Sequence, residues 1–197
     1  MDLVNRAKQI LFSPATEWDV IRQESLSTAD MFGKYVVYLA AIPAIAGFFG
    51  RSLIGYSLMG MGVYRTPFFR GLVYGLLSYL LTLAGVYLLA YIIDALAPSF
   101  GSQKDMNGSL KVAVFSSTAT WVAGVFQIIP ALSILSILGL YSFYLLFTGI
   151  RAVKQPPADK LIGYFVVTVV VALVIYVLIG IIVGTIALGG YAAGGAF

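Results

Sequence analysis

The chain alternates between long stretches without charged residues and short polar segments. Charge-free runs occupy residues 35–50, 52–64, 71–93, 112–150 and 161–197. An α-helix rises about 1.5 Å per residue and the hydrocarbon core of a bilayer is about 30 Å thick, so one crossing needs about 20 residues. Most of these runs are long enough for that. The pattern therefore predicts a polytopic membrane protein built from apolar helices.

The run at 112–150 has to contain two crossings. As one helix, the residues between Lys111 and Arg151 would be about 58 Å long, nearly twice the thickness of a bilayer core. Pro130 lies near the middle of this run. Proline lacks the amide proton of a helical hydrogen bond and disfavours helix at the preceding residue. We therefore predict a tight helical hairpin that turns at Pro130.

The runs together predict an all-α fold with five membrane-spanning helices. A cytoplasmic amphipathic segment occupies residues 1–32, a membrane domain residues 33–188, and a Gly-rich external tail residues 189–197. Within the membrane domain, the predicted spans are residues 33–50, 71–93, 112–129, 131–150 and 161–188.

The connection between the first two spans is apolar but bordered by charge. Residues 52–64 are too few to span a bilayer and are flanked by Arg51, Arg65 and Arg70. Aromatic residues within 52–70 suit the headgroup region, where such rings collect. The sequence is compatible with an external loop in the interface, or with a re-entrant hairpin whose backbone groups are satisfied by surrounding protein.

The distribution of basic residues predicts the orientation. With five spans, nine of the 12 Lys and Arg residues fall on the side of the N-terminus, and three fall on the other side, in residues 51–70. Cytoplasmic loops carry an excess of Lys and Arg. We therefore expect a cytoplasmic N-terminus and an external C-terminus.

The N-terminal segment predicts two short amphipathic helices. In residues 3–11 the apolar side chains share one face, opposite Arg6 and Lys8, and Ser13-Pro14 is a typical start for a second helix. Two arrangements are compatible with this pattern. The helices lie on the inner leaflet with Arg6 and Lys8 at the headgroups and Phe12 and Trp18 as anchors, or they cap the cytoplasmic end of the bundle.

Composition excludes a soluble domain and most catalytic chemistry. Hydrophobic residues make up 60% of the chain and charged residues 10%, against about 25% charged in soluble domains. Cys and His are absent, which excludes disulfides, Cys/His metal sites and His-based triads. The sequence contains neither a GxSxG elbow nor a phosphate-binding Gly-Lys loop. We expect no enzymatic activity, no cofactor and no nucleic-acid partner.

Several polar residues in the spans are candidates for an intramembrane function. Arg51 and Asp94 end the first and second spans, and each is compatible with an interfacial position or with a deeper functional one. Hydroxyls along a span either line a polar path or bond to neighbouring helices. The third span supplies the remaining candidates: Ser116, Ser117, Thr118, Thr120 and Gln127.

Two GxxxG patterns indicate close helix contacts. Gly71 and Gly75 lie in the second span, and Gly180 and Gly184 lie in the fifth. Small residues at this spacing let helix backbones approach closely within a membrane. We expect these four glycines to lie at helix interfaces.

Three stretches resemble the Yip (Ypt/Rab-interacting protein) domain. They are FSSTATWVAGVFQIIP at 115–130, LGLYSFYLLFTG at 138–149 and KLIGY at 160–164. The opening Phe12-Ser13-Pro14 with Trp18, and Ala41-Ile42-Pro43, are similar to the bacterial inner-membrane branch. Phe115 and Ala119 stand where that branch usually has Tyr and Pro.

The resemblance implies five spans, a cytoplasmic N-terminus and an external C-terminus. It also implies, for eukaryotic members, binding to prenylated Rab GTPases through a longer hydrophilic N-terminal region. Only about 32 residues precede the first predicted span here. We therefore expect a bacterial inner-membrane protein whose partners are the lipid bilayer and either its own copies or another membrane protein.

Two hypotheses for function follow. The first is a non-enzymatic organiser, which self-associates through small-residue helix faces and uses its N-terminus at the inner leaflet. The second is a small transporter, channel or lipid-moving protein with a polar path along the third span. A dry bundle favours the first, and a continuous hydrated cavity lined by the polar candidates favours the second.

The orientation can be tested by labelling single cysteines in intact cells. We expect cysteines placed near Lys8 or Lys104 to react only from the cytoplasm and one near Gly194 only from outside, because of the bias in basic residues. Reaction of both ends with one impermeant reagent added from outside would contradict five crossings.

Overall fold

The computed structural model describes residues 2–57 and 63–194, with side chains described as far as Val177 except at residues 56, 57 and 64. Five helices within this part are long and apolar enough to cross a membrane. The predicted all-α fold with five spans is therefore confirmed. The helices are Thr28–Ile54, Phe68–Phe100, Met106–Ile128, Pro130–Lys154 and Ala158–Val177, the last of which belongs to a longer helix.

The first span consists of α3 (Thr28–Met31), η1 (Phe32–Val36), α4 (Val37–Phe48) and η2 (Phe49–Ile54). It begins where the Ser27 hydroxyl accepts a hydrogen bond from the Asp30 amide at 3.0 Å, which is a typical N-cap. It ends at Gly55, whose φ of 81° is a conformation that favours glycine. The helix is therefore longer at both ends than the predicted 33–50. The Ser27 cap sets its start at Thr28, and it continues beyond its apolar run until Gly55 ends it.

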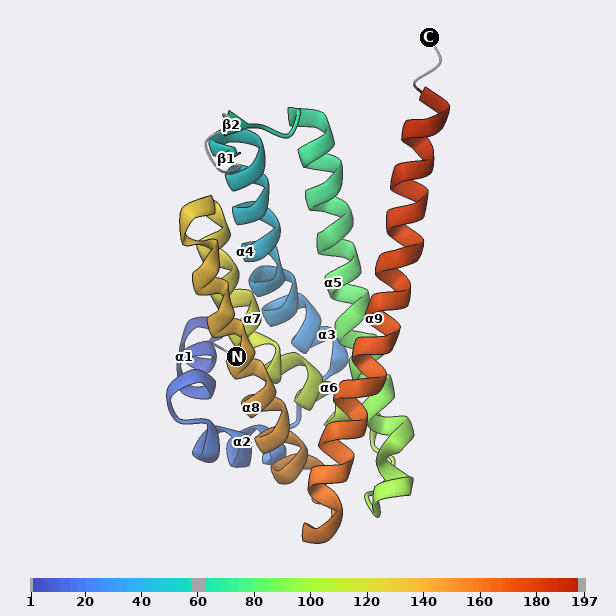
Figure 1. Cartoon of the computed structure of the whole chain (residues 1–197). Helices are drawn as coiled ribbons and strands as arrows, with labels where there is room; N and C mark the ends of the chain where they lie inside the picture. The colour runs from blue at the N-terminus through green and yellow to red at the C-terminus, as the bar shows by residue number, and fades with distance from the viewer. Residues whose placement is uncertain (1, 58–62, 195–197) are drawn as a thin grey trace.

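A short hairpin connects the first two spans. Strand β1 (Tyr56–Ser57) pairs antiparallel with β2 (Val63–Tyr64), and Tyr56 lies opposite Tyr64. Figure 1 shows this hairpin at the end of the bundle where α4 and α5 meet. The glycine-rich tip, which bears on the re-entrant alternative, falls in 58–62 and lies outside the described residues.

The second span, α5 (Phe68–Leu96) with η3 (Ala97–Phe100), packs closely against the first. A Cβ atom at Gly71 would lie 1.9 Å from Ser52 Oγ, so a larger residue here would displace the Ser52 hydroxyl. At Gly75 the nearest atoms, from Ala44 and Phe48, would be at ordinary contact distance. The first GxxxG pattern therefore lies at a helix interface, with Gly71 as its critical member.

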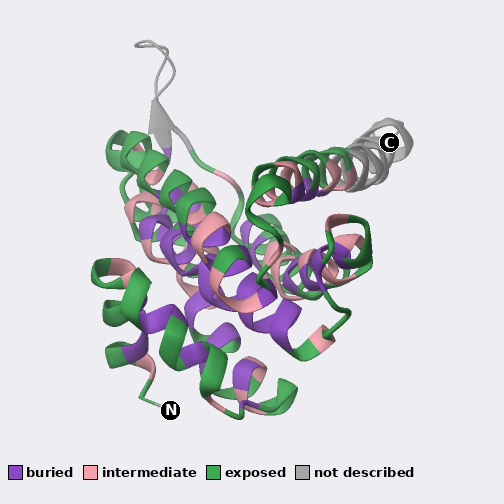
Figure 2. Cartoon of the chain, turned by 90° about the horizontal axis from the view of Figure 1, so that it is seen from below, coloured by how far each residue is buried: buried purple, intermediate pink, exposed green. Residues whose placement is uncertain are grey.

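The third span lies at the centre of the bundle. It comprises α6 (Met106–Ser116), α7 (Thr118–Ala123) and η4 (Gly124–Ile128), and every residue from Gly108 to Ser116 is buried. Helix α6 contacts elements from the N-terminal segment and from the first, second and fourth spans. The concentration of buried residues in the middle of the bundle is visible from below (Figure 2).

The chain turns between the third and fourth spans at Ile129, whose backbone is extended, and this is the residue before Pro130. The fourth span starts as an unusually long 3₁₀-helix, η5 (Pro130–Leu140), and continues through α8 (Tyr141–Gly149) and η6 (Ile150–Lys154). A Cβ atom at Gly139 would lie 3.2 Å from the Cα of Thr120, so η5 lies close to α7.

The last helix, α9 (Ala158–Gly194), leans away from the fourth span (Figure 1). It packs mainly on α5, η3 and η6. The sequence-based prediction ended this helix at residue 188, and that boundary is wrong, because the helix continues to Gly194. Ala favours helix and no proline interrupts this segment, so hydrogen bonds continue through its glycines.

The N-terminal segment forms α1 (Leu3–Phe12) and α2 (Pro14–Gln23), as the pattern predicts. Both helices lie along the side of the bundle next to the third and fourth spans (Figure 1). Asp2 caps α1 by accepting from the Asn5 amide at 3.1 Å, and Pro14 opens α2. The segment is therefore a packed cap, which is one of the two arrangements that the sequence allows.

Gly50 and Gly33 provide a matched test of the packing. A Cβ atom at Gly50 would lie 2.1 Å from the Gln127 carbonyl oxygen, whereas one at Gly33 would meet nothing within 4 Å. We expect Gly50→Ala to destabilise the protein by about 1–3 kcal/mol through overpacking. Gly33→Ala should leave stability unchanged or raise it by up to about 1 kcal/mol, because its methyl group meets open space and alanine favours helix. Thermal unfolding in detergent measures both, and equal effects would contradict the contact between the first and third spans.

Candidate functional site

The N-terminal cap is held by a buried cation. Arg6 donates to Glu17 Oε1 at 2.5 Å and to Glu24 Oε2, and its guanidinium carbon lies 5.8 Å from the centre of the Phe115 ring. The side chains of Arg6 and Glu17 are only 10% and 11% exposed. The expectation that Arg6 contacts headgroups is therefore wrong, because two carboxylates and a ring from the third span enclose its charge.

Trp18 is also buried rather than anchored in lipid. Its indole Nε1 donates to the Thr148 hydroxyl at 3.1 Å, and its ring lies on Gly149, where a Cβ atom would come within 2.6 Å. The glycine of the fourth span thus creates the space that the indole fills. The predicted anchoring role of Trp18 is wrong, because the fourth span offers both an apolar surface and a hydrogen-bond acceptor.

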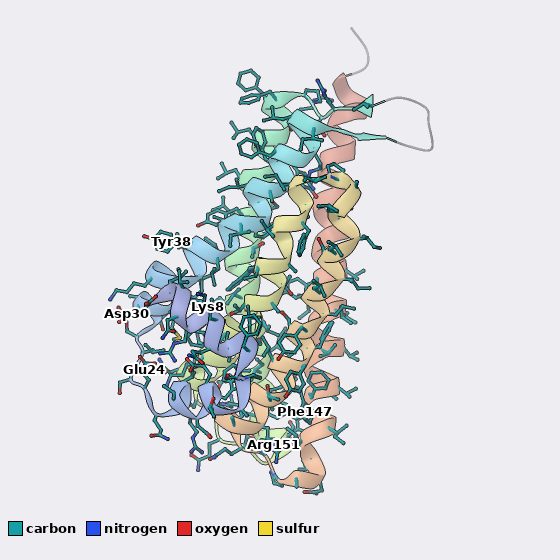
Figure 3. The ribbon with its side chains drawn as sticks, turned by 90° about the vertical axis from the view of Figure 1, so that its left-hand side faces the viewer. Lys8, Glu24, Asp30, Tyr38, Phe147 and Arg151 are labelled. Carbon is teal, nitrogen blue, oxygen red and sulfur yellow. The ribbon has the colours of Figure 1, made fainter. Side chains whose placement is uncertain are left out.

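The outer side of α1 remains exposed. Val4, Lys8 and Phe12 recur every four residues, and the Phe12 side chain is 83% exposed. We call these three residues the α1 outer stripe. Figure 3 labels Lys8 on α1 and, beyond α2, Glu24. Lys8 and Phe12 therefore remain available for contacts with lipid or protein.

A polar cluster links the ends of the second, third and fourth spans. Asp94 Oδ1 accepts from the Asp105 amide at 2.7 Å and from the Ser109 hydroxyl at 3.2 Å. It also pairs with Lys154 Nζ at 3.5 Å, and Lys154 donates to the Asp105 carbonyl oxygen at 3.2 Å. Asp94 thus forms hydrogen bonds with chain segments that lie far apart in the sequence. This supports a structural role at the end of its span.

The hydroxyls of the third span mostly bond within the protein. Ser116 and Ser117 donate to the Ala113 carbonyl oxygen at 3.3 and 2.8 Å. Thr118 is fully buried, and its hydroxyl lies 2.8 Å from the Tyr35 hydroxyl of the first span. Thr120 links α7 to α8, because its Oγ1 lies 2.9 Å from Ser142 Oγ.

Arg51 and Gln127 lie near each other at the opposite end of the bundle. A Cβ atom at Gly47 would be 2.8 Å from an Arg51 guanidinium nitrogen and 3.3 Å from Gln127 Oε1, so both side chains surround this glycine. The guanidinium also stacks 4.6 Å from the centre of the Tyr74 ring, which is a cation–π distance.

The structure therefore divides the seven polar candidates into three separate groups. Asp94 lies at one end of the bundle, Arg51 and Gln127 lie at the other, and the hydroxyl residues 116–120 lie between them. Ser116, Ser117 and Thr120 line a cavity of about 550 Å³, whereas Thr118 packs toward Tyr35 on the first span.

The sequence comparisons agree with this architecture. The Yip1 domain model matches residues 8–193, nearly the whole chain. The chain belongs to the Yip1-domain family. The Inner membrane protein YohC of Escherichia coli strain K12 is 26% identical to it over 187 residues, which cover 92% of this chain and 94% of that protein. The protein of the same name from E. coli O6:H1 strain CFT073 matches with the same values. No solved structure matches the chain.

Sequence reasoning missed the partners of this Yip1 domain's polar residues. Glu17, Glu24, Lys154, Tyr35 and Ser142 were not among the candidates, although each bonds to a polar residue discussed above. Glu17 and Glu24 lie 11 and 18 residues from Arg6, beyond the end of α1, so helical spacing does not indicate them. The others lie 22 to 83 residues from their partners, and no local pattern indicates such pairs.

Two further candidates lie where the structure gives no test. Gly180 and Gly184 belong to α9 of the Yip1 domain but lie beyond Val177, outside the residues whose side-chain surroundings are described. Their predicted place at a helix interface stays a prediction.

The role of Arg6 in the Yip1 domain can be tested against Lys8. We expect Arg6→Met to destabilise the protein by about 3–5 kcal/mol, because it leaves Glu17 buried without its partner. Lys8→Gln on the exposed side of the same helix should change stability by less than about 0.5 kcal/mol. Thermal unfolding and protease cleavage near residue 13 report the result. Equal unfolding temperatures and equal cleavage of the two variants would argue against a packed cap.

Proposed function

We propose that this Yip1-domain protein acts without catalysis in a bacterial inner membrane, as an organiser that associates with copies of itself or with another membrane protein. Two relatives that match along nearly their whole length carry the name Inner membrane protein YohC. The apolar length of its five helices supports integral insertion.

The observation that carries this proposal is the separation of the polar residues. The Asp94 group, the hydroxyl group around Thr118 and the Arg51 group lie at different levels along the helices. Asp94, Thr118 and Thr120 bond to neighbouring helices, and Ser116 and Ser117 bond within their own helix. A conduit needs polar groups that continue from one side of the membrane to the other, and interhelical bonding is the usual role of such hydroxyls.

The N-terminal cap supplies a surface for recruitment. Because Arg6 and Trp18 fix α1 and α2 on the bundle, the α1 outer stripe is presented in a constant orientation. An exposed aromatic ring next to a basic side chain suits the inner leaflet or a membrane-associated partner.

A lipid-moving activity is the second candidate, and one observation favours it. The cavity beside the third span is lined by Ser116, Ser117 and Thr120, three of the residues that a polar path would use. It lies between α5, α8 and α9, and the groups of Asp94 and Arg51 do not line it.

The two candidates can be separated with single alanine variants of Ser116, Ser117 and Thr118. We expect each serine variant to lose less than about 0.5 kcal/mol, because both hydroxyls bond to the Ala113 carbonyl oxygen of their own helix. Thr118→Ala should cost about 1–3 kcal/mol, since the Tyr35 hydroxyl is left unpaired. Thermal stability in detergent and solute or lipid flux in liposomes are measured on the same samples. Unchanged stability together with altered flux would overturn the organiser proposal.

Self-association can be tested with two differently tagged copies in liposomes. We expect resonance energy transfer between labelled copies to persist when lipid is added in excess. Phe12→Ser, on the exposed stripe, should reduce this transfer or the capture of an inner-membrane partner without lowering the melting temperature. Ala15→Ser, on the exposed side of α2, is a matched control. Loss of transfer on dilution for the native protein, with no partner captured, would count against an organiser.

A further inference from the structure

A groove opens from the side of the bundle into the space that lipid occupies. Its volume is about 550 Å³, and its walls come from α5, from η5 with α8, and from α9. The third span forms its floor. Because α9 packs mainly on α5, η3 and η6, the groove lies where α9 and the fourth span diverge. The divergence of these two helices can be followed in Figure 1.

The groove lies at mid-membrane depth and is nevertheless polar on its floor. Thr82, Thr120 and Ser142 each line it near the middle of their spans. Thr120 is exposed in the structure, and Ser142 is half-buried. Polar residues in spans normally face the bundle interior, because hydrocarbon offers them no hydrogen bond. Thr120 and Ser142 bond to each other, and their exposure leaves them accessible to a ligand that brings further hydrogen-bonding groups.

The hydrogen bonds on the floor define what the ligand has to offer. Ser116 and Ser117 use their protons on the Ala113 carbonyl oxygen, so their oxygens retain acceptor capacity. Ser142 Oγ accepts from the Thr120 amide at 3.0 Å and from Thr120 Oγ1 at 2.9 Å. Thr120 Oγ1 also lies 3.2 Å from the Gly139 carbonyl oxygen, and its single proton serves only one of these two acceptors, so the Ser142 proton is free for a ligand when Thr120 donates to Ser142. A complementary ligand has a hydroxyl that donates and a carbonyl that accepts.

We propose that this groove binds a neutral lipid of the diacylglycerol class. Such a lipid carries one free hydroxyl beside ester carbonyls, and its acyl chains match walls made by Ile137, Leu140, Phe143 and Leu173. None of the described residues that line the groove is charged. A phospholipid would have to bring a charged headgroup to mid-membrane depth, where charge is costly. Binding here is separate from the proposed organising function and does not require it.

The size of the groove favours a lipid over a helix from a second copy. A spanning helix about 10 Å across and about 30 Å long occupies about 2,400 Å³, several times the volume available. Small-molecule sites typically measure about 300–1,000 Å³. The groove therefore holds the glycerol region and the first part of an acyl chain, while the remainder stays in the bilayer.

Photolabelling of the full-length protein in phosphatidylcholine nanodiscs tests this site. The probe is a diacylglycerol with a photoreactive acyl chain, and labelled positions are mapped by mass spectrometry. We expect labels on η5, α8 and α9 around Leu140, Phe143 and Leu173. Unlabelled diacylglycerol should halve this labelling at a concentration at least tenfold lower than its methyl ether requires. The methyl ether has the same shape but no hydroxyl proton.

Three variants complete the test. The double variant Ser116→Ala/Ser117→Ala should abolish the preference for the free hydroxyl, because it removes the oxygens that accept from it. Ile137→Trp, at an exposed position on the rim, should block labelling by filling the groove. Ser133→Ala, an exposed serine of η5 outside the groove, should behave as the native protein. Unfolding temperatures identify any variant that fails to fold. Because Ile137→Trp keeps every floor hydroxyl, its effect reports the filling of the groove.

Two outcomes would overturn the proposal. Equal competition by diacylglycerol and its methyl ether would mean that the floor hydroxyls do not recognise the lipid. Labels distributed over the outer surfaces of α4 and α5, and unaffected by Ile137→Trp, would mean that the probe contacts the bundle as bulk lipid does.

Discussion

The burial of the third spanning helix is the constraint on which the other elements depend. Hydrocarbon offers no partner to a polar group, so the polar side chains of this helix bond within the protein, and several of them bond to different neighbouring segments. Ser109 donates to the second span, Thr118 pairs with the first, and Thr120 pairs with the fourth. Lys111 donates to the Glu24 carbonyl oxygen beyond α2 at 2.6 Å. The helix thereby sets the positions of four other segments.

The N-terminal cap follows from the same physical constraint. Arg6 carries a full charge against the third span, and such a charge is tolerated only when it is paired and hydrogen bonded. Glu17 and Glu24 provide these bonds, so α1 and α2 are held on the bundle together. The apolar faces of α1 and α2 and the charged group of Arg6 therefore contact other parts of the protein. What remains for contacts with lipid or partners is the α1 outer stripe.

The position of α9 decides where the bundle is open. Tyr164 donates to the Ile93 carbonyl oxygen and stacks on Phe100, and Tyr176 donates to the Gly85 carbonyl oxygen at 2.8 Å. These three contacts hold α9 on the second span. The Phe165 ring of α9 also meets the Phe147 ring of α8 at 5.5 Å between centroids, and the two helices diverge beyond this pair. The hydroxyls of the third and fourth spans therefore face a lateral groove, and this Yip1 domain combines a closed centre with one open side.

The sequence by itself determined the number of spans and the turn before Pro130. Apolar length and the missing proline amide act locally, without knowledge of any neighbour. It also predicted two amphipathic helices at the N-terminus. It did not decide which surface covers their apolar faces, since lipid and an apolar bundle surface both bury such a face. Only the tertiary structure decided that Arg6 and Trp18 turn inward, because Glu17 and Thr148 lie 11 and 130 residues away from them. The groove likewise exists only where four segments meet, since its shape depends on how α9 packs and not on any one stretch of chain.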